Sequence, residues 1–116
     1  EKSGYTAAKI LMLSRELPDC LVCANDNMAI GAMKAFRENG IRVPEDIAVT
    51  GFDNCDLAEA MGLTTVSIPN YERGYIAARY LIENIRGERN VETFKISAKI
   101  IWRNTVETKE NNLIVK

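Results

Sequence analysis

The apolar positions of the chain form short runs separated by longer amphipathic stretches, which is typical of strands that alternate with helices. Strands are predicted over residues 20–24, 47–51, 64–68 and 94–102. Helices are predicted over residues 3–15, 27–39, 56–61 and 70–86. The first three strand runs are apolar without alternation, as in parallel sheets that helices cover on both faces. The pattern therefore predicts an α/β fold with a parallel sheet flanked by helices.

Helical spacing also predicts which side chains face the core. In the first helix, the apolar residues that recur near the helical period are Ala7, Ile10, Leu11 and Leu13. In the second helix, the stripe expected to face the sheet is Ala29, Ala32 and Phe36. Ile30, Met33 and Arg37 lie together on another side of that helix, turned away from the stripe. Gly40 is expected to end this helix at the C′ position.

Polar and aromatic side chains follow three of the predicted strands. They are Asn25 and Asp26, then Phe52 and Asp53, then Asn70 and Tyr71. In a doubly wound sheet, ligands bind outside the carboxyl ends of the strands, so these residues are candidates for one site. A carboxylate accepts hydroxyl hydrogen bonds, an amide both donates and accepts, and a ring packs against an apolar sugar or base face. For Asn25, Asp26 and Asn70 the alternative role is that of a helix N-cap.

Composition and charge narrow the function. Fifteen basic and sixteen acidic residues give a net charge of −1, which is not the charge pattern of a chain that binds nucleic acid by itself. No apolar run approaches the ~20 residues of a membrane span. The chain has no His and three Cys, and no metal site is predicted. Cys20 and Cys23 are expected on opposite faces of a strand as core thiols. No catalytic motif is present, so no enzyme and no cofactor are predicted.

Several motifs in order resemble those of LacI/GalR-type bacterial transcription regulators. They are C-A-N-D-x-x-A-x-G-A at 23–32, G-I-R-V-P-E-D-I at 40–47, G-F-D-N at 51–54, L-T-T-V at 63–66 and W-R-N-T at 102–105, where the family usually shows R-E-S-T. Each motif alone is weak, and their combination is specific. The match runs from about Ser3 to Thr105 and resembles the carboxyl-terminal part of the effector-binding core.

The resemblance implies an incomplete lobe of the periplasmic-binding-protein type I fold. Residues 1–105 would form this part of the core, residues 69–87 would belong to the otherwise missing first lobe, and residues 106–116 would be a polar tail. The implied partners are a small effector of the sugar or nucleoside class, a second copy of the chain in a homodimer, and operator DNA through a helix-turn-helix absent from this chain. A cytoplasmic location is expected, with no membrane partner.

The resemblance also suggests roles for single residues. Asn25 and Asp53 lie where effector contacts are expected, and Asp26 is expected to cap the following helix. Ile30, Met33 and Met61 resemble the dimer interface, with plain core packing as the alternative for the first two. The family's common Gln-Pro is Ile68-Pro69 here, which shifts attention to Asn70 and Tyr71.

Two other functions stay open at the level of sequence. One is a periplasmic sugar-binding protein of a transport system, which shares the fold and the type of site. The V-P-E-D-I turn and the terminal 102–105 motif favour the regulator. The other is a dimerisation module with a vestigial site.

Overall fold

The computed structural model describes residues 1–88 and 93–107, which divide into two compact units. The first unit comprises Glu1–Ser67 together with the chain from Ile100 onward, and the second comprises Ile68–Lys99. The predicted polar tail falls outside the described residues from position 108 onward.

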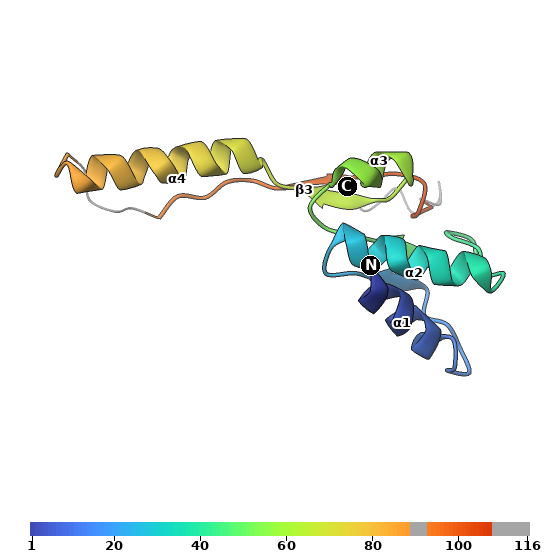
Figure 1. Ribbon diagram of the computed structural model, residues 1–116. Helices are drawn as coiled ribbons and strands as arrows, with labels where there is room; N and C mark the ends of the chain where they lie inside the picture. Colours follow the sequence, from blue (N-terminus) through green and yellow to red (C-terminus); the bar gives the residue numbers. More distant parts are fainter. Residues whose placement is uncertain (89–92, 108–116) are drawn as a thin grey trace. The chain divides into compact units, whose positions relative to one another are not determined.

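Helices and strands follow one another in the predicted order (Figure 1). The helices are α1 (Lys2–Leu11), α2 (Asp26–Glu38), α3 (Asp56–Ala60) and α4 (Asn70–Ile85). The strands are β1 (Cys20–Val22), β2 (Ala48–Thr50), β3 (Thr65–Ser67) and β4 (Lys99–Ile101). The strands are shorter than their apolar runs, because a run of strand-forming residues counts as strand only where another strand pairs with it.

The predicted parallel pairing is confirmed for the first two strands. β1 lies beside β2 in parallel, with Cys20 opposite Ala48 and Val22 opposite Thr50. A further parallel bridge joins Thr50 to Thr64, immediately before β3. β3 is hydrogen-bonded to β4 in a second two-stranded sheet. The carboxyl ends of β1, β2 and β3 are thus brought to one edge of the first unit.

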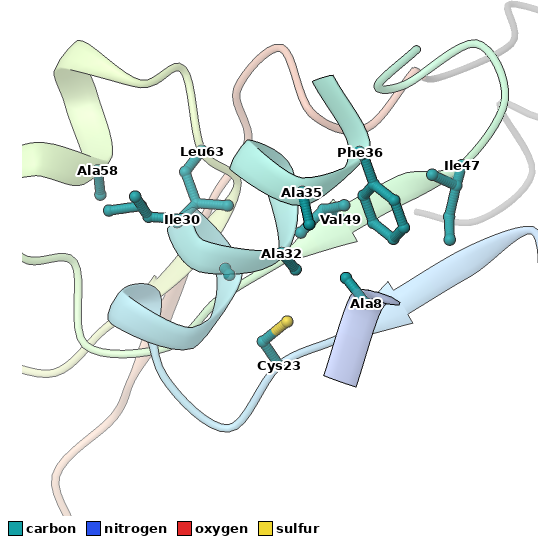
Figure 2. Close-up of a cluster of buried hydrophobic side chains, with 11 residues drawn as sticks. Ala8, Cys23, Ile30, Ala32, Ala35, Phe36, Ile47, Val49, Ala58 and Leu63 are labelled. Carbon is teal, nitrogen blue, oxygen red and sulfur yellow. The ribbon is translucent and has the colours of Figure 1, made fainter. Parts of the chain in front are cut away.

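The core of the first unit lies between the sheet and the helices α1 and α2 (Figure 2). Its largest fully buried apolar side chains are Phe36, Ile47, Leu63 and Val49. Ala29, Ala32 and Phe36 are completely buried, which confirms the stripe predicted for α2. Gly40 follows α2 with a φ of 72°, as predicted for a helix C-terminus.

The buried face of α1 differs from the predicted one. Gly4 and Ala8 are its buried residues, whereas Ile10 is 64% exposed and Leu13 is 86% exposed. The reason is a close approach of two helices: a Cβ at position 4 would overlap the backbone of Met28 in α2. Small residues therefore determine the closest contact of α1. Leu11 packs against the core partly buried, as predicted, whereas Ile10 lies away from it.

Only one of the two cysteines near β1 is a core residue. Cys23 is buried, whereas Cys20 is exposed, so the prediction of two core thiols is wrong for Cys20. Among the described strands β1 pairs only with β2, and its first residue therefore lies at an uncovered edge. Burial, with a smaller effect of the neighbouring Cys20 thiolate, raises the pKa of the Cys23 thiol to about 11.

Candidate functional site

Backbone hydrogen bonds bring together the segments that follow β1, β2 and β3. The Cys23 N–H donates to the Thr50 carbonyl at 2.8 Å, and the Asp26 N–H donates to the Phe52 carbonyl at 2.9 Å. On the other side, the Asp53 N–H donates to the Val66 carbonyl at 2.9 Å. The polar residues after β1 and β2 therefore lie at one edge of the first unit, as the parallel topology predicts.

The Asp26 carboxylate is buried and joins three segments of the chain. Its side chain is 1% exposed. One oxygen accepts a hydrogen bond of 2.5 Å from the Thr65 hydroxyl, and the other accepts one of 2.7 Å from the Cys55 N–H. Both carboxylate oxygens are thus occupied by the protein, and Asp26 fixes the loop after β2 against the first turn of α2.

The predicted capping role of Asp26 is wrong. Asn25 is the N-cap residue of α2, and its Oδ1 accepts a hydrogen bond of 2.9 Å from the Met28 N–H. Asp26 is the first residue of the helix, and its carboxylate points instead to partners 29 and 39 residues away. Asn and Asp are equally good N-caps, so the order of the pair alone does not separate these two roles.

Gly51 leaves the space that the Asp26 carboxylate occupies. A Cβ at this position would overlap Asp26 Oδ1 and come within 3.0 Å of Leu63 Cδ2. The glycine is therefore required by a close approach, and its backbone is not left-handed. The G-F-D-N turn begins with glycine because the buried carboxylate lies directly against it.

Asp53 has an unusual backbone conformation, and its carboxylate accepts no hydrogen bond from the described residues. Its φ is 107°, and the following Asn54 has a φ of 54°, in the region that few residues other than glycine adopt. The Asp53 side chain is exposed, and no described residue donates a hydrogen bond to its carboxylate. Strained residues that the surroundings hold in place are concentrated at functional sites.

Asn25 and Phe52 complete the edge on the first unit. The Asn25 Oδ1 is used by α2, so the amide Nδ2 is the group that remains for a ligand. Phe52 is 37% exposed and lies one residue before Asp53. The edge therefore offers the exposed carboxylate of Asp53, an amide donor and part of an aromatic ring, which together suit a small molecule that carries hydroxyl groups.

The segment after β4 is hydrogen-bonded to the loop that carries this edge. The Arg103 guanidinium donates to the Asn54 side-chain oxygen and to the Leu63 carbonyl, both at 2.9 Å. Thr105 is 3% exposed, and its hydroxyl accepts from the Thr64 N–H at 2.9 Å. The sequence indicates Arg103 and Thr105 only as parts of the 102–105 motif, and no local pattern indicates Thr65 as a partner of Asp26.

Comparison with known proteins identifies the family. Residues 1–106 match the periplasmic binding protein-like domain. The chain is 40% identical over 109 residues to the transcriptional repressor PurR of Vibrio atlanticus, across 91% of this chain and 33% of that protein. It is 36% identical over 104 residues to the lactose operon repressor of Rhizobium radiobacter, across 88% of this chain and 92% of that protein. The chain belongs to the LacI/GalR family of transcriptional regulators.

Solved structures of the family share its fold. The Escherichia coli transcriptional repressor ascG superposes with a TM-score of 0.81 at 35% identity, over 92% of this chain and 40% of that one. The lac repressor dimer bound to operator gives a TM-score of 0.85 at 27% identity, over 92% and 38%. This LacI/GalR chain thus spans about a third of the PurR relative and about 40% of the solved regulators, whereas it spans nearly all of the Rhizobium relative.

The remaining candidate ligand residues of the LacI/GalR chain belong to the second unit. Asn70 is the first residue of α4, and Tyr71, the next, is 85% exposed. Pro69 occupies the N-cap position and no side chain caps the helix, so the alternative capping role of Asn70 is wrong. That Asn70 and Tyr71 meet the same ligand as Asn25 and Asp53 stays a prediction.

The predicted interface residues separate into two groups. Ile30 is 8% exposed and belongs to the buried cluster of Figure 2, as the core-packing alternative expects, and a contact of Ile30 with a partner stays a prediction. Ala58 of α3 and Leu63, which follows α3, belong to the same cluster. Met33 and Met61 are half-buried, and both line a surface groove of about 420 Å³. Their role at an interface stays a prediction.

Within residues 1–88 and 93–107, no group of three or more Cys, Asp or Glu side chains is arranged to hold a metal ion. In the same described ranges, no helix has the length and apolar character that crossing a membrane requires.

Proposed function

We propose that this chain is the effector-sensing part of a LacI/GalR-type transcriptional regulator and that it binds a small sugar or nucleoside at the edge formed by Asn25, Phe52 and Asp53. Asn70 and Tyr71 are further candidate ligand contacts. No cofactor takes part. The regulator acts in the cytoplasm, where its operator DNA is.

The observation that carries the proposal is the state of Asp53. Its carboxylate is exposed and has no hydrogen-bond donor among the described residues, while its backbone is fixed by the 2.9 Å bond to Val66 in a left-handed conformation. Asp26 also follows a strand, β1, but both of its carboxylate oxygens already accept hydrogen bonds from the protein. Of the two carboxylates, Asp53 is the one available to accept hydroxyl hydrogen bonds.

The chemistry agrees with what solved relatives contain. A LacI-family regulator from Enterococcus faecium was solved with bound ribose. It is 28% identical to this chain with a TM-score of 0.80, and the match covers 90% of this chain and 39% of that one. A polyhydroxylated ligand of this kind matches a carboxylate acceptor, an amide donor and a ring face. The names of the curated relatives are those of repressors, which favours regulation over transport.

The mechanism is a shift between conformations of the intact regulator. An effector that binds one arrangement of the lobes more tightly than another changes the population of that arrangement, and with it the spacing of the DNA-binding modules in a homodimer. DNA is contacted through a helix-turn-helix outside this chain, which agrees with the net charge of −1 found here.

The test is calorimetry on the intact protein with D-ribose, sucrose, lactose and adenosine, for wild type and Asp53→Asn. Asn keeps the shape and tolerates a positive φ, but removes the charge. We expect wild type to bind at least one compound and Asp53→Asn to bind it about 1.5–3 kcal/mol more weakly, the range for a hydrogen bond to a charged group. The free energy of unfolding should not change, because no described residue is bonded to this carboxylate.

Asp19→Asn is the matched control, because Asp19 is an exposed carboxylate that lies just before β1, at the opposite end of the strand. It should leave the affinity unchanged. Wild-type affinity in Asp53→Asn would remove Asp53 from the site. Failure of wild type to bind any of the four compounds would instead favour a dimerisation module with a vestigial site.

A further inference from the structure

Arg103 connects the chain after β4 to the loop that carries Asp53. Its Nη1 donates to the Leu63 carbonyl at 2.9 Å, and its Nη2 donates to Asn54 Oδ1 at 2.9 Å. Its own backbone is fixed as well, since the Arg103 N–H donates to the Thr64 hydroxyl at 2.9 Å. A guanidinium carries several donors in a rigid plane, so one side chain can bridge two acceptors nine positions apart.

The loop that receives this contact is held on either side of Asn54, by the Asp53 N–H bond to Val66 and the Cys55 N–H bond to Asp26, whereas Asn54 itself is held more loosely by its backbone. Asn54 and Asp53 both have positive φ values, 54° and 107°, a conformation that costs about 1–3 kcal/mol for each such residue and persists only where the surroundings hold it. The Asn54 N–H makes a long hydrogen bond of 3.4 Å to the Thr65 hydroxyl. Arg103 is the partner of the Asn54 side chain, and that bond is shorter.

We propose that Arg103 is a positioning residue of the candidate site, which holds Asn54 in its left-handed conformation and thereby sets the direction of the neighbouring Asp53 carboxylate. The inference rests on the proposed function, because Asp53 is taken there as a ligand contact. Arg103 itself binds no ligand. Its effect reaches the ligand through Asn54. Loss of Arg103 and loss of the Asn54 acceptor should therefore weaken ligand binding without adding to one another, which general destabilisation would not do.

The test compares variants of the intact protein with the compound, among D-ribose, sucrose, lactose and adenosine, that wild type binds. Arg103→Met removes both guanidinium bonds and keeps a side chain of similar length. Asn54→Gly keeps the positive φ at no steric cost and removes the acceptor. Each should weaken binding about tenfold, which corresponds to the loss of one hydrogen bond to a charged group. The double variant should be no weaker than either single one, because both remove the same link.

Asn54→Asp tests the link from the other direction. Aspartate tolerates the left-handed region and keeps an oxygen for Arg103 to reach, so it should bind within about twofold of wild type. Thr105→Val is the matched structural control, because it removes the hydroxyl that accepts from the Thr64 N–H and leaves Asn54 untouched. It should lower the melting temperature and leave the affinity within about twofold of wild type.

Amide hydrogen exchange of the peptide that covers residues 52–55 gives a readout without any ligand. Exchange should be faster in Arg103→Met than in wild type and Thr105→Val, because the loop loses the side-chain restraint on Asn54. Additive effects of Arg103→Met and Asn54→Gly, or wild-type affinity in Arg103→Met, would overturn the inference. If wild type binds none of the compounds, the proposed function fails, but the exchange measurement still tests the positioning role of Arg103. Unchanged exchange in Arg103→Met would overturn that role.

Discussion

The carboxylate of Asp26, at the start of α2, accepts a hydrogen bond of 2.5 Å from the hydroxyl of Thr65, at the start of β3 and 39 residues further along the chain. Both side chains are 1% exposed. The bond therefore joins α2, which follows β1, to β3, the third strand along the chain. A buried charge of this kind is tolerated because each carboxylate oxygen has a donor.

Asp26→Ala is expected to destabilise the protein strongly. The substitution leaves the Thr65 hydroxyl and the Cys55 N–H without their acceptor and removes two hydrogen bonds to a charged group, for a loss of about 3 kcal/mol or more. Urea denaturation of the intact protein measures it. Asp19→Ala, which removes an exposed carboxylate, should change the free energy of unfolding by less than about 0.5 kcal/mol. Similar losses in the two variants would contradict the role given to Asp26.

Gly51→Ala is expected to destabilise through the same carboxylate. The new methyl group would overlap Asp26 Oδ1 and press on Leu63, so the turn or the carboxylate must shift, at about 1–3 kcal/mol. Thermal unfolding measures it. The control is Gly74→Ala in α4, where a Cβ meets nothing within 4 Å and alanine favours the helix by about 0.5–1 kcal/mol. A stability of Gly51→Ala at or above wild type would show that the turn relaxes freely.

The order of elements and the parallel sheet were predictable because they depend on local pattern. The buried stripe Ala29, Ala32 and Phe36 and the end of α2 at Gly40 follow from helical period and glycine chemistry alone. The buried face of α1 was not predictable, because it depends on how closely Gly4 approaches another helix. The burial of Ile30 was not predictable for a related reason, since it depends on Ala58 and Leu63, which join the same cluster from later in the chain.

The candidate site divides in the same way. Asn25 and Asp53 could be placed at one edge from the sequence, because the carboxyl ends of parallel strands meet there. The separate roles of Asn25 and Asp26 could not, since both residues are good caps and the choice depends on a hydroxyl 39 residues away. Arg103 was missed because its contact to Asn54 spans 49 residues and leaves no local pattern.

The Cys23 thiol is expected to make stability fall in strong base. Burial holds its pKa at about 11 in the folded chain, above the ordinary 9.0. Above pH 9 the unfolded chain therefore loses this proton while the folded chain keeps it, so the contribution of Cys23 is complete below pH 9 and is lost as the pH rises toward 11. Urea denaturation between pH 8 and pH 10.5 measures the slope.

Cys23→Ala is the control for this pH dependence, because it removes the titrating thiol. Its free energy of unfolding should fall less steeply over the same pH range. Cys20→Ala should change the slope little, since the Cys20 thiol is exposed and its pKa is raised only by partial burial. An unchanged slope in Cys23→Ala would exclude Cys23 as the origin of the effect.

Met61→Lys is expected to weaken self-association of the intact protein. Met61 and Met33 line a groove that also contains Lys34, Arg37 and Arg42, so a new lysine there adds like charge to an apolar contact and should weaken a dimer by about 2 kcal/mol or more. Sedimentation equilibrium measures the association constant. Leu13→Lys is the matched control, because Leu13 is 86% exposed and lies outside the groove. Equal association constants of wild type, Met61→Lys and Leu13→Lys would show that the groove is not the interface and that Met33 and Met61 face solvent.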